Sequence, residues 1–245
     1  MIAKIKNWRA RQQFTPGRLG WVVNPFYFAR RGLHEALLRL LPELQGEVLD
    51  VGCGSKPYRS LVAATRYVGL DYDTPLRRAA GVADVYYDGG IFPLPDADFD
   101  GALCTQVLEH VFTPEAFLNE INRVLRPGGV LVLTVPFVWD EHEQPHDFGR
   151  YSSFGLRALL ERAGFEVVTL EKTPTDARAV AQIVAGWIYK LVCARGRWVN
   201  LGMQLMVIAP VSFLGVVAAA LLPRNQDFYL DNVVLARKSV SRSRP

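Results

Sequence analysis

The chain is poor in cysteine, with three among its 245 residues, and these three are far apart in the sequence. No CxxC pair occurs, which argues against both a disulfide framework and a zinc knuckle. The opening segment MIAKIKNWRARQQF carries charge but no apolar run behind it, so it does not resemble a secretory signal. We therefore expect one main domain in a reducing, cytoplasmic compartment.

Motifs for two common nucleotide sites are also missing. The dinucleotide fingerprint GxGxxG would need a glycine at position 57, where the chain has Pro57, and no GxxxxGK[ST] phosphate loop occurs. The net charge of +4 is modest, and the basic residues gather near the two ends. Basic ends suit anionic lipid, nucleic acid or plain solvation. Because no RNA-binding motif accompanies them, we expect no nucleic-acid partner.

What the sequence does contain is an alternation of apolar runs and helical segments. The runs are near-continuous rather than alternating, which predicts strands that are covered on both faces. They lie at 47–52, 66–73, 83–90, 99–106 and 128–137. A helix capped by Ser152 or Ser153 and a sixth strand follow them. This order predicts a doubly wound α/β sheet.

Two further helices are predicted from capping and spacing. The segment 114–127 should begin with Thr113 as N-cap and Pro114 in its first turn. The segment 24–46 should begin in the same way with Asn24 and Pro25. One apolar stripe in the first of these helices is formed by Phe117, Leu118, Ile121, Val124 and Leu125.

Acidic residues recur where predicted strands end, next to a glycine turn. Asp50-Val-Gly52-Cys-Gly54 lies where we expect the first strand to pass into a helix, whose free N–H groups could face a ligand. Asp71 ends the second strand, where a carboxylate can accept both hydroxyls of a ribose, and Asp88 ends the third. Three carboxylates in one crevice suit a cationic nucleoside, such as a sulfonium with an amino acid tail.

Four segments in order resemble the motifs of the class I S-adenosylmethionine-dependent methyltransferases. They are VLDVGCGSKPY, YVGLDYD, DGGIFPLPDADFDGALCTQVLEHV and INRVLRPGGVLVLTVPF. The resemblance covers about residues 47–171. It implies a seven-stranded, mostly parallel sheet with an antiparallel last strand, and S-adenosylmethionine as the cofactor.

The resemblance also implies cofactor contacts in the glycine turn. The resemblance implies that Asp50 belongs to the cofactor-binding motif, and that Gly52 and Gly54 pass under the methionine moiety. The third glycine of the usual DxGxGxG is replaced by Lys56. That lysine could pair with the methionine carboxylate or point to solvent.

Further cofactor contacts are implied at the ends of the other strands. Asp71 would hold the ribose, and Asp88 with Gly89 would hold the adenine. Gln106 would lie after the fourth strand, beside the methionine group.

The segment WDEHEQPHDFGRY follows the fifth strand, so it leaves the edge of the sheet where ligands bind. Methyl transfer to a hydroxyl requires alignment of the acceptor and removal of its proton. We expect His142 to act as the base, and His146 with Asp147 to orient the acceptor. A metal site and a purely structural lid are the alternatives. Pro145 argues against a helical metal motif, and no metal is expected.

The C-terminal third contains a long apolar insertion. Residues 198–222 carry no charge and could span a bilayer by length. A single crossing would, however, separate the predicted seventh strand, 227–238, from the sheet. We therefore expect 179–222 to form a helical hairpin that covers the domain, forms a homodimer or contacts a membrane surface.

These expectations define four segments. They are a basic segment with a cap helix (1–46), the cofactor-binding core (47–171), the apolar insertion (172–226), and the last strand with a basic tail (227–245).

The predicted function is O-methylation of a small, glycan-type or lipid-linked acceptor, in the cytoplasm or at the inner face of the membrane. A non-catalytic S-adenosylmethionine-binding scaffold and a nucleotide-dependent oxidoreductase are the rival hypotheses.

Overall fold

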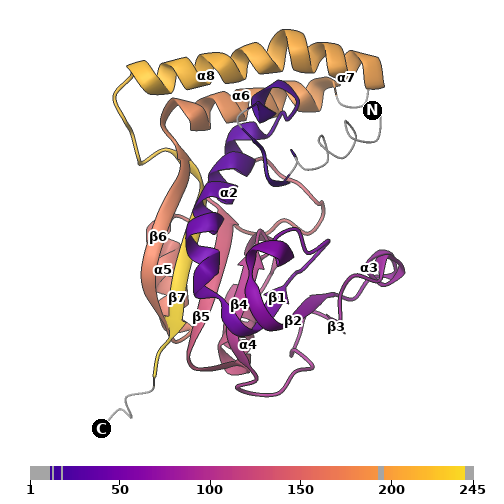
Figure 1. The fold of residues 1–245 in the computed structure, drawn as a ribbon, viewed down its shortest axis with the longest axis vertical. Coiled ribbons are helices and arrows are strands. Elements are labelled where there is room, and N and C mark those ends of the chain that lie inside the picture. Colours follow the sequence, from indigo (N-terminus) through magenta and orange to yellow (C-terminus); the bar gives the residue numbers. More distant parts are fainter. Residues whose placement is uncertain (1–11, 13, 18, 193–195, 241–245) are drawn as a thin grey trace. The chain divides into compact units, whose positions relative to one another are not determined.

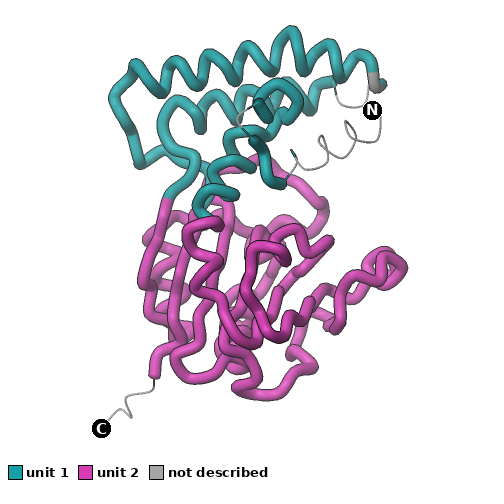
Figure 2. The backbone as a smooth tube through the Cα atoms, viewed as in Figure 1, with its two compact units in different colours: residues 1–36, 172–231 teal, residues 37–171, 232–245 magenta. Residues whose placement is uncertain are grey.

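The computed structural model describes residues 12, 14–17, 19–192 and 196–240. These residues divide into two units, which are coloured separately in Figure 2. One comprises residues 1–36 and 172–231, and the other comprises 37–171 and 232–245. The second unit contains most of the sheet and every candidate site residue, so it is described first.

A single sheet of seven strands organises this unit, with the order β3-β2-β1-β4-β5-β7-β6 (Figure 1). The strands are β1 (Gln45–Val51), β2 (Ala63–Tyr72), β3 (Val85–Tyr87), β4 (Phe99–Thr105), β5 (Leu125–Pro136), β6 (Phe165–Thr175) and β7 (Tyr229–Lys238). Strands β1 to β5 pair in parallel. The last strand, β7, is antiparallel and lies between β5 and β6. The predicted doubly wound fold is confirmed.

The sheet forms because its central strands are apolar on both faces. Val48, Leu49 and Val51 of β1 are fully buried, as expected for a strand with helices on either side. The helices of this unit are α3 (Pro75–Ala80), α4 (Pro114–Val124) and α5 (Ser153–Arg162), together with the last turn of α2 (Tyr27–Leu40), which begins in the other unit. Buried residues of α4 and α5 share one core cluster with the strands.

Helix α4 can be compared with the predictions made from its apolar spacing and its capping residues. Its predicted apolar stripe is buried, and Pro114 stands in its first turn. Thr113 occupies the N-cap position as predicted, although its side chain makes no capping hydrogen bond. In α5, Ser152 does cap the helix, because its Oγ accepts a hydrogen bond from the Gly155 N–H at 3.2 Å.

Two predicted helices differ in the structure. Helix α2 begins at Tyr27 rather than Pro25, because Asn24 Oδ1 accepts the Phe26 N–H in a turn before the helix. No α-helix follows the glycine turn in the described chain between β1 and β2, which contains only a 3-10 turn, Arg59–Leu61. Pro57 lies in that short connection and cannot donate a hydrogen bond. The predicted helix N-terminus is therefore not available to a ligand.

The other unit is built from helices α6 (Asp176–Val192), α7 (Arg197–Met203) and α8 (Ala209–Leu221). A π-helical turn, Gln204–Ile208, joins α7 to α8, so the run from Trp198 to Leu221 is one apolar helix of 24 residues. Only 28% of its most apolar window is buried. Helix α6 packs along α8.

Buried amides join this helical unit to the N-terminal segment. The side chain of Gln182, on α6, is fully buried. Its Oε1 accepts the N–H groups of Phe28 and Ala29 at 2.9 and 3.2 Å, and its Nε2 donates to the carbonyl of Pro25 at 2.9 Å. The first turn of α2 thus receives hydrogen bonds that its own backbone cannot supply.

The insertion between β6 and β7 is closed at its base. The backbone N–H of Asp176 donates to the carbonyl of Asn225 at 3.2 Å, and the N–H of Asn225 donates to the Asp176 carboxylate. The chain thus leaves the sheet through one strand and returns through its neighbour.

Candidate active site

The candidate site lies at the edge where the parallel strands β1, β2, β4 and β5 end. Gly52 follows β1, Asp71 is near the end of β2, and Gln106 follows β4. The turn after β1 is folded against β2, because the N–H groups of Gly52 and Cys53 donate to the carbonyl of Leu70 at 2.8 and 3.1 Å. This edge is where ligands bind in such sheets.

The turn itself requires glycine. Gly52 has φ of +70° and Gly54 of +50°. A Cβ at position 52 would lie 2.4 Å from Cγ2 of Val107, just after β4. Glycine therefore permits two features of this turn, which are its left-handed backbone and its close approach to the neighbouring strand end.

Lys56 has a structural role in this loop. Its backbone is left-handed, with φ of +53°. Its Nζ pairs with Oδ2 of Asp84 at 2.7 Å, and the same carboxylate oxygen accepts the N–H of Gly69. The lysine is thus neither directed to solvent nor free for a methionine carboxylate, which corrects both options that the sequence left open.

Asp50 lies beneath the glycine turn and is 3% exposed. Its Oδ2 accepts the hydroxyl of Tyr67 at 2.7 Å. Burial raises the pKa of Asp50 to about 6. This carboxyl therefore links β1 to β2 through Tyr67.

Asp71 is the best-placed acceptor for a ribose. It is 5% exposed, and its Oδ2 accepts the N–H of Gly54 at 3.2 Å. The guanidinium of Arg77 lies 3.3 Å from the same oxygen. Asp71 thus connects the glycine turn to the end of β2, and Arg77 is the cation beside it.

The predicted adenine contacts lie after β3. Asp88 is exposed, and its Oδ1 accepts the N–H of Gly90 at 3.1 Å. Gly89, with φ of +96°, lies close to the ring of Tyr72, because a Cβ there would be 3.1 Å from Cε2. Tyr72 is half exposed and packs edge-on against Tyr87. This aromatic side chain beside Asp71 was missed in the sequence, although its position directly after Asp71 could have indicated it.

Gln106 holds a conformation that non-glycine residues rarely adopt. Its φ is +54°, a strain of about 1–2 kcal/mol for an L-residue. Its backbone N–H donates to the carbonyl of Thr134, and its Nε2 donates to Oγ1 of the same residue at 3.2 Å. Strained residues of this kind cluster at functional sites.

The loop after β5 is anchored by one partly buried ion pair. Arg150 binds both oxygens of Asp147, at 2.6 and 2.7 Å. This hydrogen bonding holds the pKa of Asp147 at about 2. The same carboxylate accepts the backbone N–H of His142 at 3.0 Å. Asp147 thus fixes the loop, because its oxygens accept hydrogen bonds from the Arg150 guanidinium and the backbone N–H of His142.

The loop is also tied to the turn after β4. The N–H groups of Phe148 and Gly149 donate to the carbonyl of Glu109, at 2.8 and 3.1 Å. Nδ1 of His110 lies 2.6 Å from the carbonyl of His146. The ring of His146 itself is exposed and lies near Phe148. His142 approaches the carboxylate of Asp147, with Nδ1 3.4 Å from Oδ2.

These ties bring together two histidines from different segments. The rings of His110 and His142 meet edge to face, with centroids 4.9 Å apart. Glu109, which is fully buried, lies beside them, with Oε1 3.9 Å from Nε2 of His110. The sequence did not identify Glu109 as a site residue, and its only signal was the Glu-His pair at the end of β4.

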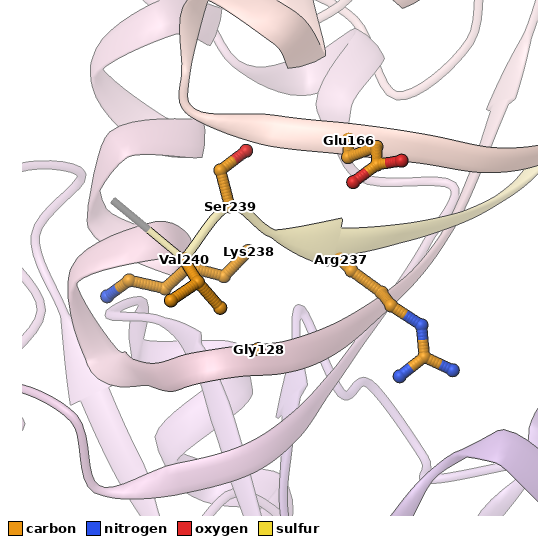
Figure 3. Close-up of a pocket in the computed structure, with 6 residues that line it drawn as sticks. All are labelled: Gly128, Glu166, Arg237, Lys238, Ser239 and Val240. Atoms are coloured by element: carbon orange, nitrogen blue, oxygen red, sulfur yellow. The ribbon is translucent and has the colours of Figure 1, made fainter. Parts of the chain in front are cut away.

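Figure 3 shows a separate pocket of about 530 Å³. It is lined by Gly128, Glu166, Arg237, Lys238, Ser239 and Val240. These residues lie toward the amino ends of β5 and β6 and at the carboxyl end of the antiparallel β7. The glycine turn follows the carboxyl end of β1, so the pocket and the turn lie at opposite ends of the parallel strands. We assign no chemistry to it.

The residues at the carboxyl edge fit S-adenosylmethionine. The positive φ values of Gly52 and Gly54 leave a turn without side chains, which a ligand can approach closely. The buried carboxylate of Asp71 adjoins that turn, where a ribose would need its acceptor. When bound, this cofactor supplies a methyl carbon activated by a sulfonium.

Comparison with known proteins gives the same class. Residues 49–133 match the family described as "Methyltransferase domain". A probable S-adenosylmethionine-dependent methyltransferase of Mycolicibacterium smegmatis is 36% identical over 156 residues, which is 58% of this chain and 60% of that protein. A fatty-acid O-methyltransferase of the same species is 32% identical over 167 residues, which is 60% of each chain. The chain thus spans about 60% of the length of these curated relatives.

Solved structures agree on the fold. An S-adenosylmethionine-dependent methyltransferase from Mesorhizobium loti has a TM-score of 0.51 at 20% identity, covering 83% of this chain and 96% of that one. The [4+2]-cyclase SpnF has a TM-score of 0.55 at 22% identity, covering 84% and 79%. Since one of these is titled a cyclase, the fold alone does not determine the reaction.

The sheet and its glycine turn define a Rossmann-like methyltransferase domain. Residues 49–133 match a methyltransferase domain, and the chain is similar in sequence and fold to class I S-adenosylmethionine-dependent methyltransferases, whose cofactor is S-adenosylmethionine.

Proposed function

We propose that the protein methylates an oxygen atom of a small, glycan-type or lipid-linked acceptor. The observation that carries the proposal is the pair of imidazoles, His110 and His142, held at the carboxyl edge of the sheet. An amine acceptor with a free lone pair needs no base, whereas a hydroxyl must lose a proton as it attacks. The relatives that are named O-methyltransferases support this choice.

The cofactor contacts remain those predicted: Asp50, Gly52, Gly54, Asp71, Asp88, Gly89 and Gln106. In the proposed reaction the acceptor oxygen bonds to the methyl carbon as the carbon–sulfur bond breaks. S-adenosylhomocysteine leaves as a neutral thioether, and the hydroxyl proton passes to the ring of His142. Nδ1 of that ring is 3.3 Å from the carbonyl of Asp140, which leaves Nε2 to face the acceptor. His146 and Asp147 contribute by shaping the loop that orients it.

The test uses the full chain, S-adenosylmethionine with a labelled methyl group, and panels of hydroxylated, carboxylated and amino acceptors. We expect label in an oxygen-linked product and a loss of about 10²- to 10⁴-fold in kcat for His142→Ala. The affinity for S-adenosylhomocysteine should stay within about threefold. Label only in amine products would refute O-methylation. Binding of the cofactor with no product from any panel would favour the scaffold hypothesis.

We also propose that the apolar helices contact the cytoplasmic face of a membrane, where a lipid-linked acceptor would be found. The helix Trp198–Leu221 has a mean hydropathy of 2.1 in its most apolar window. Trp187, Trp198, Met206 and Leu214 are each more than 60% exposed. Large apolar side chains exposed together on helices are typical of interfacial binding.

Vesicle sedimentation tests this contact. The full chain should pellet with vesicles that contain anionic phosphatidylglycerol, and Met206→Glu with Leu214→Glu should reduce the bound fraction at least tenfold. A chain that stays in the supernatant and sediments as a dimer would show instead that a second copy covers these helices.

A further inference from the structure

We propose that Glu109, His110 and His142 bind one divalent transition-metal ion beside the acceptor. The inference rests on the proposed function, which it deepens by stating how the acceptor oxygen is activated. One potential ligand atom from each of the three residues lies within 4.8 Å of the other two. Because metal bonds of about 2.1 Å place neighbouring ligands about 3–3.5 Å apart, side-chain rotations that shorten the longest of these distances by about 1.3–1.8 Å would suffice.

The hydrogen bonds of the two rings determine which nitrogen is available. Nδ1 of His110 lies 2.6 Å from the carbonyl of His146, and Nδ1 of His142 lies 3.3 Å from the carbonyl of Asp140. A carbonyl can only accept, so each Nδ1 must carry the proton, and each Nε2 keeps its lone pair. Metal-ligating histidines are oriented in the same way, by a second hydrogen bond from the ring nitrogen that does not bind the metal.

The carboxylate of Glu109 completes the ligand set from a different position. It is fully buried, and Oε1 lies on the Nε2 side of His110 at 3.9 Å. The other charged groups nearby form their own pair, since Arg150 binds both oxygens of Asp147. That pair also holds the backbone of His142 in place. The neighbouring residues Asp147 and Arg150 thus bind each other and support the ligand cluster through the backbone of His142.

Two imidazoles and one carboxylate favour first-row transition ions over Mg²⁺, which prefers oxygen ligands. Three protein ligands leave coordination positions open. An acceptor hydroxyl bound there would have a lowered pKa and would release its proton to solvent water. With the cation bound, the ring of His142 is a ligand, so release of the proton to water replaces the proton transfer to His142 that the proposed function describes for the metal-free site.

The test uses Co²⁺ alone, titrated into the chelator-treated full chain without a histidine tag. We expect one equivalent to bind, with visible absorption bands of a nitrogen-ligated site. His110→Ala and His142→Ala should each weaken binding at least tenfold. His146→Ala is the matched control, because its exposed ring lies outside the cluster, and it should bind Co²⁺ as the wild type does. Glu109→Gln keeps the buried volume while removing the charge, and it should also weaken binding.

Binding of S-adenosylhomocysteine reports whether each variant is folded. Failure of the wild type to bind Co²⁺, or equal binding by the wild type and both alanine variants, would overturn the cation site. If methyl transfer to hydroxyls then persists in chelator, the proposed function stands with His142 as a free base. Co²⁺ bound at these residues, with no transfer to any hydroxyl, would instead overturn the proposed function and leave the cation site intact.

Discussion

The replacement Asp71→Asn tests the cofactor site most directly. The carboxylate is 5% exposed, and it faces the N–H of Gly54 and the guanidinium of Arg77. Asparagine keeps the volume and one acceptor oxygen but loses the charge. A hydrogen bond to a charged acceptor contributes about 1.5–3 kcal/mol, against about 0.5–1.5 kcal/mol for a neutral one.

With two ribose hydroxyls bound, the loss should be about 2–3 kcal/mol, or about 30- to 150-fold in Kd. Isothermal titration with S-adenosylhomocysteine measures it. The matched control is Asp73→Asn, which removes an exposed carboxylate two residues away that pairs with Arg78 and should leave Kd within about threefold. If Asp71→Asn unfolds at the wild-type temperature and binds within threefold of the wild type, Asp71 does not hold the ribose.

Three further outcomes follow from single side chains. Gly52→Ala would place a Cβ 2.4 Å from Val107, so we expect loss of cofactor binding in titration; wild-type affinity would contradict the close approach. Burial raises the pKa of Asp50 from 3.8 to about 6, so its ionisation costs the folded state up to about 3 kcal/mol as pH rises through about 6, and nothing below about pH 4. Asp50→Asn should therefore unfold at higher denaturant than the wild type at pH 8 but not at pH 4, and equal midpoints at pH 8 would refute this. Asp147→Asn should weaken the bond to Arg150 by about 2 kcal/mol and speed amide exchange in residues 139–151, and unchanged exchange would show that other contacts fix the loop.

Local patterns predicted the elements whose signals are strong. The continuous apolar runs became β1 to β5 because strands buried on both faces need apolar side chains throughout. The stripe of α4 was buried as its spacing indicated. The helix expected after Gly54 is absent from the described chain because Pro57 and a left-handed Lys56 interrupt that short connection. The strand followed by a glycine turn supplied that expectation, and the local chemistry of the connection overrode it.

The candidate site was only partly predictable, for a physical reason. The placement of Asp71 against the glycine turn follows from strand ends that meet at one edge. The meeting of His110 with His142 depends on backbone hydrogen bonds from Phe148 and Gly149 to Glu109. Such bonds between distant segments leave no periodic trace in a sequence.

The closed base between Asp176 and Asn225 makes the stretch between β6 and β7 an exchangeable module. Its two ends leave from neighbouring strands, so a replacement of different length would not have to re-thread the sheet. Gln182 couples the module to the first turn of α2, so a functional graft would have to carry that N-terminal partner with it.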